Sequence, residues 1–293
     1  MIARLRRSLA YRLPRLYARL LDTFPPRPRP PKPPHPATLV TFTGPEGLAL
    51  LRESLASLYA AWPRLPPVRV VSDGRLGAAE AQHVLAWWPG PLEVVSWREE
   101  LESLGGHYDP SLLRFAEREV MGRKLAAILA GARRGPILYC DTDVLWFRDP
   151  ARLDELLDPT GPPLLVPSLD MEREYDDRLV PGRLAELASS PPACAGFLFA
   201  RGDLLAACPM DETLAFAAER GVGRTEQTIV AELARRTGDR RWPEEEVACT
   251  AGDRFSLAPT FRGRPWTARH YVAPARHLFW TDALALRLGR RRP

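Results

Sequence analysis

Short apolar runs alternate with longer segments of helical periodicity through the first half of the chain. Apolar residues that recur every three or four positions indicate amphipathic helices, and short runs rich in Val and Ile indicate strands. Because strands that alternate with helices are typical of βαβ units, we expect an α/β fold with a mainly parallel sheet flanked by helices. The pattern predicts strands at 37–43, 68–72, 92–96 and 136–140, and helices at 48–61, 78–88 and 112–132.

The alternation weakens after residue 150. Apolar runs at 164–166 and 196–200 predict two further strands, and residues 225–237 have the periodicity of a helix. The sequence shows no internal repeat of the kind that marks solenoids and propellers. We therefore expect residues 37–293 to form one domain.

The N-terminal segment has a different character. Leucine and isoleucine recur at helical spacing over residues 2–21, with arginines elsewhere around the helix and Pro14 placed to kink or split it. Residues 25–36 read PPRPRPPKPPHP, which favours an extended polyproline spacer. This change in composition predicts a basic helical arm and linker over 1–36. The apolar stripe consists of Ile2, Leu5, Leu9, Leu13, Leu16 and Leu20.

The charge of the chain is concentrated in its ends. Of 293 residues, 45% are apolar and 26% are charged, which is ordinary globular composition. Residues 1–36 hold nine Lys or Arg and one Asp, a charge of +8 in a chain of +5, so the remainder carries −3. A basic arm on an acidic body favours an anionic membrane surface, bound through residues 1–24, over nucleic acid. The alternative is that the helix packs on the body.

Cysteine spacing and the N-terminus bear on the cellular setting. The four cysteines are widely spaced and form no C-x-x-C pair, which argues against a zinc site. The arginine-rich start lacks the continuous apolar core and small-residue cleavage site of a secretory signal. The sequence also has no uncharged apolar window of about 18 residues that would predict a membrane span. We expect reduced thiols and a cytoplasmic protein, peripheral on the membrane.

The most informative motif is an acidic pair after a strand. The apolar run 137–140 leads into Asp141-Thr142-Asp143, and a second apolar run follows at 144–147. Ligands of open α/β sheets bind beyond the carboxyl ends of strands. Two carboxylates between apolar segments are costly without a positive partner, and Mg²⁺ or Mn²⁺ with substrate phosphates is such a partner. The structural alternative is a turn whose acids cap a helix or pair with arginine.

Here the chain resembles glycosyltransferases of the GT-A fold, a Rossmann-like architecture in which a strand-end D-x-D holds the metal that binds a sugar-nucleotide diphosphate. The resemblance covers roughly residues 38–280. Residues 37–47, which include Thr43, are similar to the first βα unit of the nucleotide site, and Asp73 ends the second strand as a base or ribose contact. Arg123 and Lys124 match basic residues near the nucleotide.

The resemblance continues into the second half of the chain. Residues 192–197 look like the turn and strand that shape the sugar pocket, and Glu226-Gln227 resembles an acid–Gln pair before a late helix. His270 and Arg276 resemble the H-x-x-G-x-x-K segment of the glycogenin-like retaining branch, which implies a third metal ligand and a diphosphate contact. The chain departs from that branch because it has Ala273, Arg276 and Cys194 in place of Gly, Lys and Asn.

The resemblance implies a metal-dependent, hexosyltransferase-like enzyme that uses a nucleotide-sugar donor. Asp141, Asp143 and His270 would hold Mn²⁺ or Mg²⁺, and the metal with Arg276 would stabilise the charge of the departing diphosphate. An inverting enzyme also needs a carboxylate base, for which Glu226 and Asp211 are candidates, whereas a retaining enzyme needs none. The stereochemistry therefore stays open. The basic arm suggests a lipid-linked or polysaccharide acceptor.

Other functions compete with this interpretation. Haloacid-dehalogenase-like phosphatases also have a D-x-D after a strand, and Asp176-Asp177 could serve as their later acidic pair. Their motif, however, requires Thr or Val where this chain has Leu145, and it normally opens the domain. A sugar-1-phosphate nucleotidyltransferase would need a Gly-rich, Arg-containing loop that residues 43–47 do not supply. A non-catalytic glycan- or nucleotide-binding protein is the third alternative.

Overall fold

A six-stranded sheet forms the centre of the molecule. The computed structural model describes residues 2–106, 108–158, 160–180 and 182–289, without the side chains of residues 2–6. Strand β7 runs antiparallel to both of its neighbours, and the other five strands point the same way, which confirms the expected mainly parallel sheet. The strand order is β3 (Leu92–Ser96), β2 (Val68–Ser72), β1 (Thr38–Thr43), β4 (Ile137–Cys140), β7 (Ala193–Arg201) and β6 (Leu164–Leu169).

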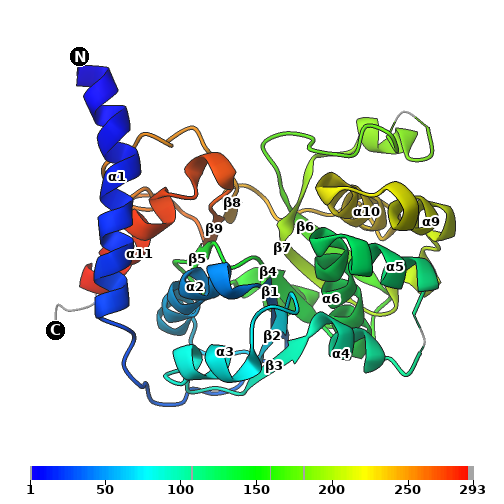
Figure 1. Ribbon diagram of the computed structural model, residues 1–293, viewed down its shortest axis with the longest axis horizontal. Helices are drawn as coiled ribbons and strands as arrows, with labels where there is room; N and C mark the ends of the chain where they lie inside the picture. Colours follow the sequence, from blue (N-terminus) through cyan, green and yellow to red (C-terminus); the bar gives the residue numbers. More distant parts are fainter. Residues whose placement is uncertain (1, 107, 159, 181, 290–293) are drawn as a thin grey trace.

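Helices cover both faces of this sheet (Figure 1). Side chains of successive strand residues point to opposite faces. In β4, Ile137 and Tyr139 therefore belong to one core layer, and Leu138 and Cys140 belong to the other. The first layer lies under α4 (Trp97–Glu102), α5 (Pro110–Arg118), α6 (Val120–Arg134), α9 (Asp211–Arg220) and α10 (Gly223–Arg236), and the second under α2 (Leu48–Ala61) and α3 (Ala78–Leu85).

One predicted helix is wrong in its continuity. The periodic segment 112–132 forms two helices, α5 and α6, which meet at Glu119 in an extended conformation (φ −125°, ψ 134°). Gly122 lies so close to the end of α5 that a Cβ there would be 2.6 Å from the carbonyl oxygen of Phe115. The periodicity survives this break because both helices pack on the same core. Among the other predictions, helix 78–88 ends early, at Leu85.

A second, three-stranded sheet begins where β4 ends. Its order is β5 (Val144–Trp146), β9 (Ala268–His270) and β8 (Val247–Ala248). Asp141, Thr142 and Asp143 therefore form the junction between the two sheets. The antiparallel pairing of β5 with β9 sets Val144 opposite His270. The short helices α7 (Ala151–Leu156) and α8 (Leu204–Ala207) and three 3₁₀ turns at Pro45–Gly47, Ala185–Ala188 and Ala273–Ala275 complete the fold.

The N-terminal helix packs on the body instead of extending away from it. Helix α1 (Ile2–Thr23) is continuous through Pro14, so of the two predicted outcomes, a kink or a split, the split is wrong. It lies along α11 (Leu278–Gly289), at one edge of the molecule (Figure 1). Leu21 joins a buried cluster with Tyr271 and Phe279, and this packing offsets the hydrogen bond that proline removes. The predicted stripe is only partly covered: Leu9 and Leu13 are half-buried, Leu16 and Leu20 are exposed, and the side chains of Ile2 and Leu5 lie outside the described residues.

The proline-rich linker is tied to the end of α2. The Lys32 ammonium donates to the carbonyl oxygen of Trp62 at 2.6 Å, and the backbone N–H of His35 donates to the carbonyl oxygen of Leu65 at 2.8 Å.

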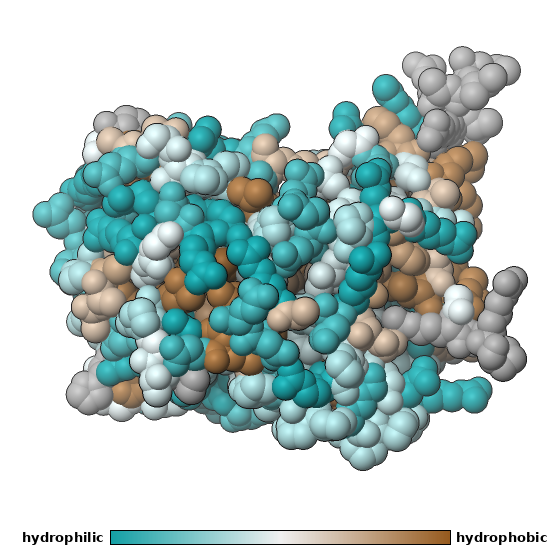
Figure 2. Space-filling view, turned by 180° about the vertical axis from the view of Figure 1, so that it is seen from behind, coloured by the Kyte–Doolittle hydropathy of each residue, from teal (hydrophilic) through white to brown (hydrophobic). Residues whose placement is uncertain are grey.

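Seen from behind, the edge formed by α1 carries apolar side chains beside hydrophilic ones (Figure 2). Within the part of the chain that the structure describes, none of the helices combines the length and apolar character needed to span a bilayer.

Candidate functional site

Three side chains that the sequence marks as metal ligands meet at the junction of the two sheets. Asp141 follows β4, Asp143 precedes β5 and His270 ends β9. The His270 Nε2 lies 3.3 Å from an oxygen of Asp143 and 3.7 Å from an oxygen of Asp141. One ligand atom from each residue lies within 4.8 Å of the others. Asp143 and His270 are buried, whereas Asp141 is 27% exposed, so the cluster opens to solvent on one side.

A glycine makes room for the histidine. Gly196 lies in β7, and its carbonyl oxygen accepts a hydrogen bond from the backbone N–H of Asp141 at 2.8 Å. A Cβ on Gly196 would lie 2.2 Å from the Cε1 of His270, which is well inside van der Waals contact. The absence of a side chain at 196 therefore fixes how closely the imidazole approaches the carboxylates.

Two cations flank the acidic pair. Lys124, from α6, is buried and lies 3.1 Å from Asp141 and 3.6 Å from Glu226. Arg276 lies beyond β9, and its Nε donates to Asp143 at 2.6 Å, while its side chain is 57% exposed. Lys124 is thus held in the interior, whereas Arg276 reaches the cluster from the surface.

These contacts shift the titration of the cluster. Burial acts to raise the pKa of Asp143, but the neighbouring charges of His270 and Arg276 outweigh it and lower the pKa to about 2. Burial likewise acts to lower the pKa of Lys124, and Asp141 and Glu226 reverse that effect, so the net pKa is raised. The Asp143 carboxyl is therefore ionised at neutral pH, as metal ligation by a carboxylate requires.

A second acidic group lies next to the cluster. Burial raises the pKa of Glu226 to about 7, with Lys124 opposing the shift, and one of its carboxyl oxygens has no hydrogen-bond partner among the described residues. The Gln227 amide donates to Asp170 at 3.0 Å. Burial also raises the pKa of Asp170 to about 6. Glu226 and Asp170 are thus carboxyl groups whose protonation changes near neutral pH.

The predicted nucleoside side of the site is built mostly from internal contacts. Asp73 is buried, and it accepts hydrogen bonds at 2.8 Å from the backbone N–H and the guanidinium of Arg75. Arg123 donates to the carbonyl oxygens of Ala116 and Asp73, at 2.9 and 2.8 Å. Thr43 is buried at the end of β1, and the backbone N–H of Asp73 donates to its carbonyl oxygen. These residues lie together, with Arg123 holding the turn through the backbone.

Asp211 is the sequence-predicted residue that stands apart. It is an exposed residue in the first turn of α9, where a carboxylate complements the helix dipole. Within the described part of the chain, no hydrogen bond or ion pair connects it to Asp141, Asp143 or His270.

Sequence reasoning missed three residues that contribute to the site. Asp170 directly follows β6, and this is the same strand-then-acid signal that marks Asp141. The Tyr139 hydroxyl donates to Asp141 at 2.6 Å from within β4. Cys249 and Cys194 both lie near His270, and no sequence motif around Cys249 predicted this position.

Comparison with known proteins identifies the fold. Mouse xyloside xylosyltransferase 1 superposes with a TM-score of 0.53 at 14% identity, covering 82% of this chain and 98% of that one. The galactosyltransferase LgtC, solved with donor and acceptor sugar analogues, gives a TM-score of 0.54 at 17% identity, covering 85% and 95%. The bifunctional glycosyltransferase WbbM gives 0.53 at 12% identity, and the match spans about half of its length (49%).

No protein-family model and no curated protein matches this chain in sequence. The likeness to the solved structures is therefore one of fold. The chain has the mixed α/β fold of GT-A-type glycosyltransferases, as its resemblance to them implies.

Proposed function

We propose that this chain is a metal-dependent glycosyltransferase that moves a hexosyl group from a nucleotide-diphosphate donor to a hydroxyl of its acceptor. The observation that carries the proposal is the convergence of Asp141, Asp143 and His270 at the carboxyl end of a parallel strand. Its fold, shared with enzymes that transfer sugars, supports the same reaction class.

The residues of the cluster fit a hard divalent cation. Carboxylate oxygens and an imidazole nitrogen suit Mn²⁺, and carboxylates suit Mg²⁺. The three ligand atoms lie near enough to one another to hold a single ion, and the exposed side of Asp141 leaves room for phosphate oxygens. When bound, such an ion neutralises charge on the leaving diphosphate.

Two cationic side chains of this chain, Arg276 and Lys124, have separate electrostatic roles. The Arg276 side chain is exposed beyond the cluster, so its guanidinium can turn from Asp143 to a diphosphate oxygen and form a charge-assisted hydrogen bond. Lys124 is buried between two acids and keeps Asp141 oriented. Thr43 and Asp73 form the nucleoside side, and Arg123 positions the turn that holds them.

The sugar side of the site belongs to Glu226, Gln227 and Asp170. Glu226 has a carboxyl oxygen without a hydrogen-bond partner among the described residues, 3.6 Å from the Lys124 ammonium, and a pKa raised to about 7, chiefly by burial. Such a group can take a proton from an attacking hydroxyl, which is the role an inverting reaction needs. Gln227 is held by Asp170 and would bind the sugar or the acceptor. Asp211, exposed on α9, is the weaker candidate for a base.

A phosphatase of the haloacid-dehalogenase class is a poorer match. Its later acidic pair would be Asp176 and Asp177. Asp176 instead accepts hydrogen bonds from Arg178 at 2.6 Å and from the Thr225 hydroxyl at 2.6 Å, so it organises the start of α10.

Binding of nucleoside diphosphates tests the proposal. The melting temperature is measured with each diphosphate, with and without Mn²⁺, because a ligand of the native state raises it by mass action. We expect one base to give an Mn²⁺-dependent rise in wild type and in Asp149→Asn, an exposed control in the same segment, and none in Asp141→Asn. Absence of a shift with every diphosphate, or an equal shift in Asp141→Asn, would contradict the proposal.

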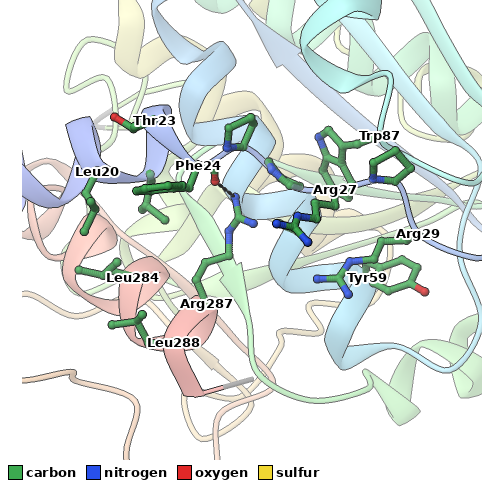
Figure 3. Close-up of a pocket in the computed structure, with 15 residues that line it drawn as sticks. Leu20, Thr23, Phe24, Arg27, Arg29, Tyr59, Trp87, Leu284, Arg287 and Leu288 are labelled. Atoms are coloured by element: carbon green, nitrogen blue, oxygen red, sulfur yellow. Dashed lines mark hydrogen bonds between the residues drawn. The ribbon is translucent and has the colours of Figure 1, made fainter. Parts of the chain in front are cut away.

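The acceptor is lipid-linked in this proposal, and the N-terminal arm, residues 1–36, meets the cytoplasmic face of an anionic membrane. An apolar cavity of about 850 Å³ lies where the arm joins the body, away from the acidic cluster. Leu20, Leu284 and Leu288 lie on one side of it, and Arg27 and Arg29 lie on the other (Figure 3). Exposed apolar side chains beside arginines suit a surface of anionic lipid.

Point substitutions test membrane binding better than removal of the arm, which would expose the cluster around Tyr271 and Phe279. Phe24 is 57% exposed at the rim of the cavity, and Leu257 is 40% exposed outside it. We expect the full chain to sediment with anionic vesicles, Phe24→Ser with Arg27→Glu to reduce sedimentation, and Leu257→Ser to leave it unchanged. Equal sedimentation of all three proteins would refute this role of the arm.

A further inference from the structure

A second group of ligands lies on the opposite side of His270. Cys194 is near the start of β7, and Cys249 directly follows β8. The Cys194 sulfur is 3.2 Å from the Nδ1 of His270, and the two sulfurs and the imidazole each offer an atom within 4.8 Å of the others. All three side chains are buried, and none of the contacts in the acidic cluster uses Cys249.

A carboxylate lies beside one member of the group. The Cys249 sulfur lies 3.6 Å from an oxygen of Asp170. Tetrahedral zinc with sulfur at about 2.3 Å and nitrogen or oxygen at about 2.0–2.2 Å places neighbouring ligand atoms roughly 3.5 Å apart. The measured separation of 3.2 Å between the Cys194 sulfur and the His270 Nδ1 is close to that value. Two sulfurs and one imidazole thus lie close enough together to be three ligands of one zinc ion, with the fourth position left to water.

We propose that Cys194, Cys249 and His270 form a three-ligand site for Zn²⁺ that is separate from the acidic pair. Thiolates favour zinc over Mg²⁺ and Mn²⁺, which prefer oxygen. The ion binds both cysteines as thiolates, so their thiol protons are released to solvent on binding. The sequence did not predict this site, because its ligands come from separate segments and the cysteines form no C-x-x-C motif.

The shared histidine makes the two sites antagonistic. A neutral imidazole has one nitrogen with a free lone pair, and the other nitrogen carries the proton. Ligation through Nε2 serves the side of Asp141 and Asp143, whereas ligation through Nδ1 serves the cysteines. Zn²⁺ at the thiols therefore withdraws His270 from the acidic pair. This antagonism rests on the proposed function, but zinc binding itself does not.

Cobalt reports on the thiol site directly. Reduced, full-length protein is titrated with Co²⁺, which gives a thiolate-to-metal absorption band when cysteine is a ligand. We expect the band to saturate at one equivalent in wild type and to disappear on addition of Zn²⁺. It should persist in Cys208→Ala, which changes a buried cysteine outside the group, and be lost in Cys249→Ala and Cys194→Ala.

The antagonism is measured with Mn²⁺, whose electron paramagnetic resonance signal is strong when the ion is free. One equivalent of Zn²⁺ should release more bound Mn²⁺ from wild type than from Cys249→Ala, where Zn²⁺ can displace Mn²⁺ only by direct competition at the acidic pair. A wild type without the cobalt band, a band that persists in Cys249→Ala, or thiols that pair as a disulfide in place of binding Co²⁺ would overturn the zinc site. A normal band with no Mn²⁺ binding would count against the acidic metal site alone.

Discussion

Two buried carboxylates follow strands of this molecule, and their partners come from very different places. Asp73 follows β2 and is bound by Arg75, two residues later in the same turn. Asp143 lies between β4 and β5 and is bound by His270 and by Arg276, the latter 133 residues further along the chain. Because Arg75 lies in the same turn as Asp73, their contact stabilises only that turn. Partners that converge from separate strands bring several charges to one point, where a ligand can use them.

The comparison also separates two kinds of arginine. The Arg75 guanidinium is shared between Asp73 and Glu46, so its charge is balanced within the turn. Among the residues that the structure describes, the Arg276 guanidinium pairs with Asp143 alone, and its side chain is largely exposed. The Asp73 turn therefore holds its charges in place, whereas the Asp143 cluster offers a cation that can be redirected to a phosphate.

The largest effect should come from neutralising each carboxylate in turn. Asp143→Asn removes one ligand and one charge, so Mn²⁺ affinity should fall by at least about 100-fold, beyond the loss typical of residues that only support a ligand. Asp73→Asn should keep Mn²⁺ affinity and lower stability by about 1–3 kcal/mol, through a weaker hydrogen bond to Arg75. Mn²⁺ titration and thermal melting measure both variants. Equal Mn²⁺ affinities would remove the distinction between the two carboxylates.

A methyl group at Gly196 should give the next largest effect. Its Cβ would displace the His270 ring, so Gly196→Ala should weaken Mn²⁺ binding by about 10–100-fold. The overpacking should also lower stability by about 1–3 kcal/mol. Gly77→Ala is the control, because a Cβ there meets nothing within 4 Å. Retention of full Mn²⁺ affinity in Gly196→Ala would show that His270 is not a ligand.

The pH dependence of stability sharpens the assignment of Glu226. Its pKa is raised in the folded state to about 7 by burial, against 4.5 as the reference value. The folded state therefore binds the proton of Glu226 more tightly than the unfolded state does. The stabilisation of the folded state that results is lost as the pH rises from about 4.5 through 7. Glu226→Gln should melt above wild type at pH 8, with the difference closing towards pH 5. A difference that is the same at both pH values would contradict a buried, titrating Glu226.

The smallest effect is expected at the exposed end of the Asp73 turn. Glu46 and Arg75 form an ion pair whose side chains are 70% and 61% exposed. Such surface pairs contribute little and are screened by salt. Glu46→Gln should leave the melting temperature and Mn²⁺ affinity nearly unchanged. A clear loss of nucleoside diphosphate binding would instead give this turn a direct part in the site.

The sequence predicted those parts of the fold that depend on residues close together in the chain. Strands β2 and β3 and helix α2 were placed correctly from periodicity alone, and the apolar run before Asp141 correctly predicted a strand there. The break at Glu119 was missed because the periodicity of the apolar face continues across it. The split at Pro14 was wrong because packing along α11 keeps the helix continuous.

The candidate site likewise has residues that the sequence predicted and residues that only the structure revealed. His270 and Arg276 were singled out through their resemblance to a known motif, and only the pairing of β5 with β9 brings them to Asp143. The domain boundary near residue 37 and the catalytic part of Asp211 stay predictions. The approach of Cys249 to Cys194 and His270 left no signal in the sequence, because the three lie on separate strands or loops.

The sequence by itself determined the α/β alternation, the acidic pair after β4 and the basic arm. Each depends on residues that are neighbours in the chain, so hydrophobic periodicity and charge are enough to specify them. The tertiary structure alone decided which charges meet, which nitrogen of His270 faces carboxylates and which faces sulfur, and how far the arm is covered. Those outcomes depend on strand order and on the close approach at Gly196, which join residues far apart in the chain.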